Sequence, residues 1–317
     1  MPPEAATLDA QATPASGSAD KLLQRLEWTS LRRLEGLLQG DYRTLMRGAG
    51  LDLADLREYQ LHDDVRHIDW NVTARLQQPH VRQFTEDREM TVWFLLDLSA
   101  SVDFGSGERT KRQTSAELVG TLARLLTRHG NRVGAVLYGE GVQQVLPARS
   151  GRRHVLHLLQ SMAAPRSVPG SKAPADGVTR LTELLAAGVQ TMKRRSTVFV
   201  VSDFISQPGW DRPLAQLVQK HDVVAVRLVD PLELDLPNLG LITLHDAETG
   251  EHMLVDTSDQ RFRGRFARIA AQREAELMEG LTRAGADTLE LSTDDDLVDT
   301  LMRFIDLRRR RQRLRAA

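Results

Sequence analysis

From Thr91 onward, short apolar runs alternate with longer segments whose apolar residues recur at helical spacing. The apolar runs predict strands at residues 92–97, 132–138, 197–202, 222–229 and 287–291. The intervening and following segments predict helices at about 110–129, 151–162, 179–192, 211–220, 258–284 and 294–310. Apolar strands that alternate with amphipathic helices indicate a parallel sheet covered by helices on both faces. The predicted fold class is therefore α/β, with a doubly wound, mostly parallel sheet.

Two features interrupt this alternation. A strand at 142–146 follows its predecessor after a short turn, so it should pair antiparallel and lie at an edge of the sheet. The stretches 239–244 and 252–255 flank turn residues at 246–250 and predict a β-hairpin.

We expect four parts along the chain. Residues 1–19, rich in Ala, Pro, Ser and Gly, are expected to be a disordered tail. Residues 20–90 should form an N-terminal helical and β segment, with a helix in 21–38 and an edge strand at 80–84. Residues 91–306 should form the main domain, which includes a hairpin insertion at about 238–256. Residues 307–317 should form an arginine-rich C-terminal tail, a solvated or frayed helix end.

Composition excludes several classes of function. The 317 residues include no Cys, which rules out disulfides, thiolate zinc sites and cysteine nucleophiles. A net charge of -1, from 42 basic and 43 acidic residues, argues against a general nucleic-acid-binding surface. No run approaches the roughly 20 apolar residues of a membrane span, and no signal peptide is recognisable. We therefore expect a soluble, cytoplasmic protein.

The segment Asp97-Leu98-Ser99-Ala100-Ser101 carries the main functional signal. It follows the apolar run 92–96, so three oxygen-bearing side chains at alternate positions come at the end of a buried strand. Oxygen ligands suit a hard divalent cation such as Mg2+, or Mn2+ in its place. The other interpretation is that Asp97 and the two serines cap the helix that follows.

This pattern resembles the metal-ion-dependent adhesion site of von Willebrand factor A domains. That resemblance implies two further ligands: a Thr at the start of a helix and an Asp that ends a later strand. Thr179 lies in the matching Gly-Val-Thr-Arg-Leu stretch, and Asp203 directly follows the predicted strand 197–202. The resemblance also implies that an acidic residue of a partner completes the coordination of the metal.

A second signature precedes the domain. It comprises Arg-Glu-Tyr at 57–59, a dense charged stretch at 62–71, and Thr-Ala-Arg at 73–75. With Asp-Pro-Leu-Glu at 230–233, this resembles the bacterial domain-of-unknown-function fifty-eight family, over about residues 30–305. That family often has Pro-Gly where this chain has Leu-His at 61–62, which removes a glycine-dependent tight turn.

The charged stretch predicts a network of ion pairs that holds the N-terminal segment against the main domain. The proposed structural ion-pair block has five charged residues around one aromatic ring, that of Trp70: Asp63, Asp64, Arg66, Asp69 and Arg75. The alternative is a second metal site made by His62, Asp63, Asp64 and His67.

The main hypothesis for function is a non-enzymatic, metal-dependent interaction protein. The family resemblance implies a partner class, the MoxR-type AAA+ ATPases, with this chain as adaptor or co-chaperone between ATPase and client. One rival is a Mg2+-dependent phosphohydrolase with Asp97 as nucleophile, although Ser99 stands where such enzymes need a second Asp. The other rival is nucleic-acid binding through the arginine-rich tail.

Overall fold

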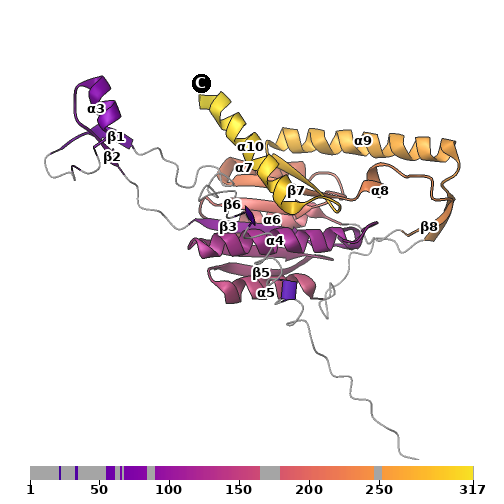
Figure 1. Cartoon of the computed structure of the whole chain (residues 1–317). Helices are drawn as coiled ribbons and strands as arrows, with labels where there is room; N and C mark the ends of the chain where they lie inside the picture. The colour runs from indigo at the N-terminus through magenta and orange to yellow at the C-terminus, as the bar shows by residue number, and fades with distance from the viewer. Residues whose placement is uncertain are drawn as a thin grey trace, which may run out of the picture.

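The computed structural model describes residues 21–22, 33–34, 55–60, 65, 68–83, 90–164, 179–245 and 252–316 (Figure 1). A six-stranded sheet in the order β10-β7-β6-β3-β4-β5 forms its centre. All neighbouring strands in it are parallel except β4 and β5, which are antiparallel. The strands are β3 (Thr91–Asp97), β4 (Arg132–Tyr138), β5 (Val142–Arg149), β6 (Thr197–Ser202), β7 (Asp222–Val229) and β10 (Asp287–Ser292).

Helices cover both faces of this sheet, as the alternating sequence pattern predicts. One face carries α4 (Lys111–Arg128), α5 (Arg152–Ala163) and α10 (Leu297–Ala316). The other carries α6 (Leu181–Thr191), α7 (Asp211–Lys220) and the end of α9 (Gln260–Ala284). The α/β, doubly wound prediction is therefore confirmed, with β3 inside the sheet and β5 as its antiparallel edge strand.

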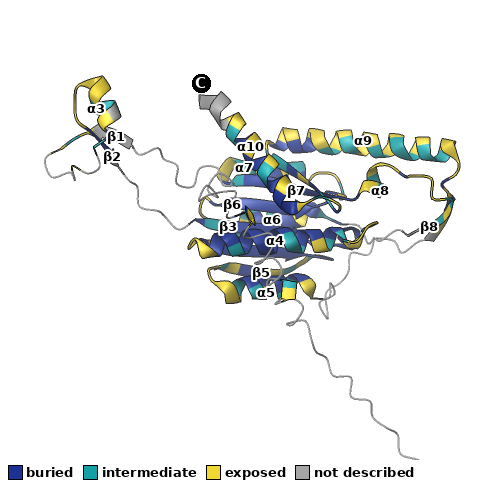
Figure 2. Cartoon of the chain, in the orientation of Figure 1, coloured by how far each residue is buried: buried dark blue, intermediate teal, exposed yellow. Residues whose placement is uncertain are grey.

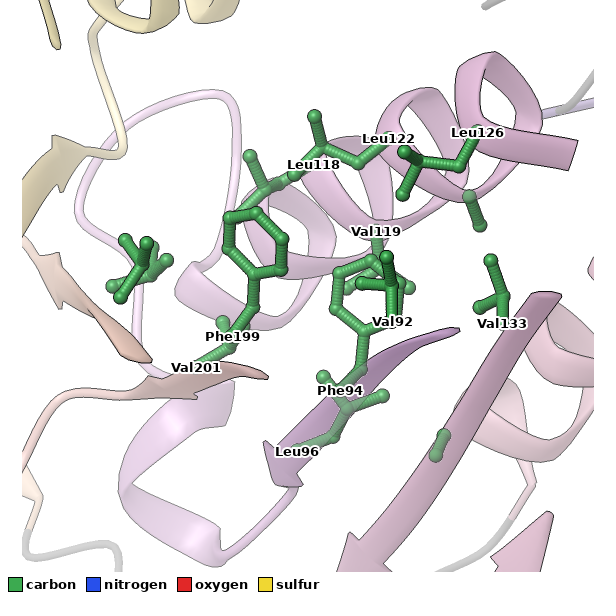
Figure 3. Packing of buried hydrophobic residues seen from close by; sticks show 14 of the residues in the cluster. Val92, Phe94, Leu96, Leu118, Val119, Leu122, Leu126, Val133, Phe199 and Val201 are labelled. Atoms are coloured by element: carbon green, nitrogen blue, oxygen red, sulfur yellow. The ribbon is translucent and has the colours of Figure 1, made fainter. Parts of the chain in front are cut away.

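Successive residues of β3 supply two separate cores. Phe94 and Leu96 point toward α4, where the ring of Phe94 lies 5.5 Å from that of Phe199 (Figure 3). Trp93 and Leu95 belong to the second core, on the α6 and α7 side. Full burial of each such apolar side chain contributes roughly 1.5–3 kcal/mol to the stability of the fold. This burial on both faces holds β3 and its carboxyl end in place.

The C-terminal helix differs from its prediction. The helix α10 continues to Ala316, so the arginine-rich segment from residue 307 is helical and belongs to the same element. Arg308 is only 2% exposed and binds Asp222 and Asp287, at distances of 2.7 and 2.9 Å. The prediction of a solvated or frayed end is wrong for Arg308. Its two partners are the first residues of β7 and β10, and these carboxylates hold the guanidinium against the sheet.

The N-terminal segment contains a small antiparallel pair, β1 (Asp55–Glu58) with β2 (His80–Gln83), and the short helix α3 (Trp70–Leu76). The expected strand at 80–84 is thereby confirmed as β2. Asp69 is buried and its Oδ1 accepts a hydrogen bond of 3.2 Å from the backbone N–H of Val72 in the first turn of α3. Asp63, Asp64 and Arg66 lie outside the described residues, as does most of the predicted helix at 21–38.

The proposed block around Trp70 differs from expectation in one respect. The Trp70 side chain is 70% exposed and Arg75 is also exposed, so neither lies at the centre of a buried charge network. Asp69 is a helix-capping carboxylate, a role that its position just before α3 explains.

The predicted hairpin is formed by β8 (Leu241–His245) and β9 (His252–Asp256), which follow the four-residue helix α8 (Pro231–Leu234). The following helix α9 is 25 residues long, yet its buried residues are only Gly280, Leu281 and Ala284 (Figure 2). The first twenty residues of α9 therefore contribute no buried side chain to the core. Across the described part of the chain, every helix is too short or too polar to cross a bilayer.

Candidate metal centre

The candidate ligands come from the carboxyl ends of two adjacent strands. In an open parallel sheet, two neighbouring strands can be followed by loops that lead to opposite faces of the sheet. The space between those two loops, beyond the carboxyl ends of the strands, is where ligands bind. Here β3 ends at Asp97 and its neighbour β6 ends at Ser202, directly before Asp203. Both carboxylates are buried, with relative exposures of 0% for Asp97 and 3% for Asp203.

The Asp-x-Ser-x-Ser segment folds back on itself. The backbone N–H of Ser99 donates to Oδ1 of Asp97 at 3.0 Å, and the hydroxyls of Ser99 and Ser101 lie 3.2 Å apart. A 3-10 helix, η4 (Ala100–Asp103), begins after Ser99, but the Ser99 side chain makes no capping bond to it. The helix-cap interpretation therefore fails for Ser99, and its hydroxyl faces Ser101 instead.

The loop after β6 is bent toward this segment. Phe204 has a φ of 59°, the left-handed region that side-chain-bearing residues rarely adopt. This bend sends the Phe204 ring into the core beside Trp210, with centroids 5.3 Å apart. It also allows the Ser202 hydroxyl to donate to Oδ2 of Asp97 at 2.6 Å and to accept from the N–H of Phe204 at 2.9 Å.

Thr179 reaches the same edge through the β6 loop. Its side chain is buried, and its backbone carbonyl accepts hydrogen bonds from the Ser206 hydroxyl at 3.0 Å and from the Gln207 N–H at 3.1 Å. The next residue, Arg180, donates its N–H to the hydroxyl of Tyr138, which pairs with Asp97 in the sheet. These hydrogen bonds thus connect the Thr179 segment to β4 and to the loop after β6, and β4 and β6 are the two strands on either side of β3.

Electrostatics distinguish the two carboxylates. Burial, together with the nearby charge of Asp203, raises the pKa of Asp97 from 3.8 to about 6, against the opposing effect of hydrogen bonds from Ser202 and Ser99. Asp203 has a cationic neighbour, because the ammonium of Lys111 lies 2.7 Å from its Oδ2. A divalent cation beside Asp97 would relieve the repulsion that raises this pKa.

Sequence reasoning missed Lys111 and Glu233. The Lys111 side chain is completely buried at the first residue of α4, and its ammonium contacts Asp203 and, at 2.6 Å, Glu233. Burial alone would lower the pKa of Lys111, but the charges of Asp203 and Glu233 outweigh it and raise the pKa. A sequence signal did exist: a cation in the first turn of a helix opposes the helix macrodipole.

The donor set fits Mg2+. All the side chains offer oxygen, and the 3.2 Å between the two serine hydroxyls is close to the roughly 3.0 Å between adjacent ligands of an octahedron with bonds of about 2.1 Å. Among the described residues, no three His, Cys, Asp or Glu side chains gather as a metal site. A cation held here would therefore depend on hydroxyls as well as on the two carboxylates.

Without metal, the raised pKa of Asp97 predicts a pH dependence of stability. Because the folded pKa of about 6 lies above the unfolded value, the stabilisation from protonated Asp97 is full at low pH and is lost as the pH rises through 6. In EDTA, we expect the free energy of unfolding to fall by about 1 kcal/mol more between pH 5 and pH 7 in the native chain than in Asp97→Asn. Denaturant titrations at both pH values measure this difference, and parallel pH profiles would contradict it.

Comparison with known proteins finds a matching family model and several bacterial relatives. A family model described as "Protein of unknown function DUF58" matches residues 55–276. Uncharacterized proteins of Mycobacterium tuberculosis and Mycobacterium bovis are 37% identical over 292 residues, which cover 91% of this chain and 89% of each relative.

Solved structures with similarity to the chain include the conserved hypothetical protein BatB of Bacteroides thetaiotaomicron. That similarity has a TM-score of 0.44 at 12% identity, over 70% of this chain and 99% of BatB. The SpRpn10 VWA domain gives a TM-score of 0.37 at 11% identity, over 68% of this chain and 94% of that domain.

Proposed function

This chain belongs to the DUF58 family of proteins of unknown function, and we propose that it is a metal-dependent protein-interaction module. In this proposal Asp97, Ser99, Ser101 and Thr179 hold Mg2+ or Mn2+, with Asp203 bound directly or through water. The metal supplies a positive centre with an open position that a carboxylate of a partner can fill. The protein carries out no reaction of its own.

The observation that supports this proposal most is the arrangement at the end of β3. The two serine hydroxyls lie at a spacing suited to one cation. They follow Asp97, whose pKa is raised by burial and by the nearby charge of Asp203. A divalent cation would offset both the burial of the Asp97 charge and its repulsion from Asp203.

Two exposed apolar side chains flank the proposed metal position in sequence. Phe104 follows η4 and is 37% exposed, and Ile205 follows Asp203 by two residues and is 47% exposed. A charged centre with apolar residues nearby suits a protein partner, since apolar contacts and one charged contact together give both affinity and orientation.

The partner class follows from the family resemblance alone. We propose a MoxR-type AAA+ ATPase, or its client, with an Asp or Glu that reaches the metal. The chain would then act as adaptor or co-chaperone for that ATPase in the cytoplasm.

Partner binding gives the test of this function. Binding of the purified full-length chain to the MoxR-type ATPase of the same genome should require Mg2+, and EDTA should weaken it at least tenfold. Ser99→Ala and Thr179→Ala should each weaken binding in Mg2+ because each removes a neutral metal ligand. Ser161→Ala, which removes a hydroxyl on α5 that donates to the carbonyl of His157, is the matched control and should bind as the native chain does. Equal affinity in EDTA and Mg2+ would refute the metal requirement.

A further inference from the structure

A lysine lies inside the candidate metal centre. Lys111 is the first residue of α4, and its side chain has no exposed surface. Its ammonium lies 2.7 Å from Asp203 Oδ2 and 2.6 Å from Glu233 Oε1. It thus joins the loop after β6 to the first turn of α8, which follows β7.

The position of Lys111 is costly without these carboxylates. The ammonium is withdrawn from water, and its backbone lies at the positive end of the α4 macrodipole. The first turn of α4 is already capped by Thr110, whose hydroxyl accepts from the N–H of Gln113. The Lys111 side chain is therefore not required to cap the helix. Its ammonium binds Asp203 and Glu233 and lies 6.0 Å from the centroid of the Phe104 ring.

The second carboxylate is itself fixed. Glu233 Oε2 accepts a hydrogen bond of 3.2 Å from the N–H of Asp230, in a capping box of α8 that also has Asp230 accept from Leu232. Asp230 is fully buried and also accepts from the side chains of Ser106 and Thr293. Glu233 is consequently held in place beside Lys111, with one carboxylate oxygen on the ammonium and the other on the N–H of Asp230.

A count of charges shows what Lys111 does for a bound cation. Asp97, Asp203 and Glu233 with one ammonium leave two negative charges, which a divalent cation neutralises. Without the ammonium, the same cation would leave one negative charge. A site with residual negative charge would repel the acidic partner residue that the proposed function requires.

We propose that Lys111 is a resident counter-ion that competes with the divalent metal for Asp203 and thereby sets how tightly the metal is held. This inference rests on the proposed metal site. Lys111 keeps metal affinity below what two free carboxylates would give, and it keeps the loaded site able to accept a carboxylate from outside. Bound metal would then be exchangeable rather than permanent.

Calorimetric titration of the full-length chain with MnCl2 and MgCl2 tests the proposal. Lys111→Met keeps the length of the side chain and removes its charge, which frees Asp203 for the metal. We expect Lys111→Met to bind Mn2+ about tenfold tighter or more than the native chain. Glu233→Gln should bind more weakly, because Lys111 then has only Asp203 as its charged partner.

A double variant controls for the effect of leaving a buried charge without its partner. Lys111→Met with Glu233→Gln removes the ammonium and one carboxylate together, so the net charge of the group is that of the native chain. It too should bind Mn2+ more tightly than the native chain, because Asp203 no longer has an ammonium in contact. Melting curves provide a second measurement: added Mn2+ should raise the melting temperature more in both Lys111 variants than in the native chain.

Affinity equal to or weaker than the native value in both Lys111 variants would overturn the proposal and leave Lys111 a purely structural ion pair. Absence of metal binding in all variants would overturn it as well. Failure of the proposed function is a separate result. In that case the ATPase binds the native chain equally with and without metal, while the Lys111 variants still show their order of metal affinity.

Discussion

Asp97→Ala is expected to abolish binding of Mg2+ and Mn2+ while the fold survives. Asp97 is the candidate carboxylate ligand that Lys111 does not contact, and a unit charge at about 4 Å is worth about 4 kcal/mol at an effective dielectric of 20. Loss of that charge should weaken metal binding by more than about a hundredfold. Isothermal titration of the full-length variant with MnCl2 measures the effect.

The fold should tolerate this change because two effects oppose each other. The variant leaves the Ser202 hydroxyl and the Ser99 N–H without their acceptor, but it also removes a buried negative charge next to Asp203. Asp294→Asn is the matched control, since Asp294 is an exposed carboxylate just after β10 at the same edge of the sheet. Native metal affinity in Asp97→Ala, or an equal loss in Asp294→Asn, would contradict the assignment.

Arg308→Ala should give the largest loss of stability outside the core. The guanidinium contacts Asp222 and Asp287, which begin β7 and β10, and lies 5.5 Å from the ring centroid of Phe304. Truncation of one partner in a buried ion-pair group leaves the other charges uncompensated and costs roughly 3–5 kcal/mol. We expect the melting temperature to fall by about 10 °C, as read by circular dichroism.

Arg310→Ala provides the comparison, because Arg310 is exposed two residues further along α10. Its melting temperature should stay within about 1 °C of the native value, as surface substitutions usually change stability little. Equal effects of the two substitutions would mean that general positive charge on α10, rather than the buried contacts of Arg308, stabilises the helix.

The four central strands of the large sheet, β3, β4, β6 and β7, were predictable because each is buried on both faces. Runs such as 92–96 and 198–201 are continuously apolar, whereas an amphipathic helix has polar residues on one face and so interrupts such a run. The helix α3 was not predictable in the same manner. Its seven residues include β-branched and aromatic side chains that disfavour helix, and it depends on the carboxylate of Asp69 at its start.

Only part of the candidate site could be predicted from the sequence. Asp97 and its serines lie within five residues, so their convergence followed from local spacing. Glu233 is 122 residues from Lys111, and the contact between them exists only because β7 lies next to β6 in the sheet. Pairings of this kind depend on strand order, which periodicity alone does not specify.

The helix α9 has a consequence for local unfolding. Its buried residues all lie after Glu279, and Glu274 adds an ion pair with the buried guanidinium of Arg227. The amides before Glu274 are thus protected mainly by the helix's own hydrogen bonds, which are weak in an isolated helix of this length. Hydrogen exchange should therefore proceed along α9 as a gradient, fast near Gln260 and slow near Leu281, with opening of the first turns uncoupled from global unfolding.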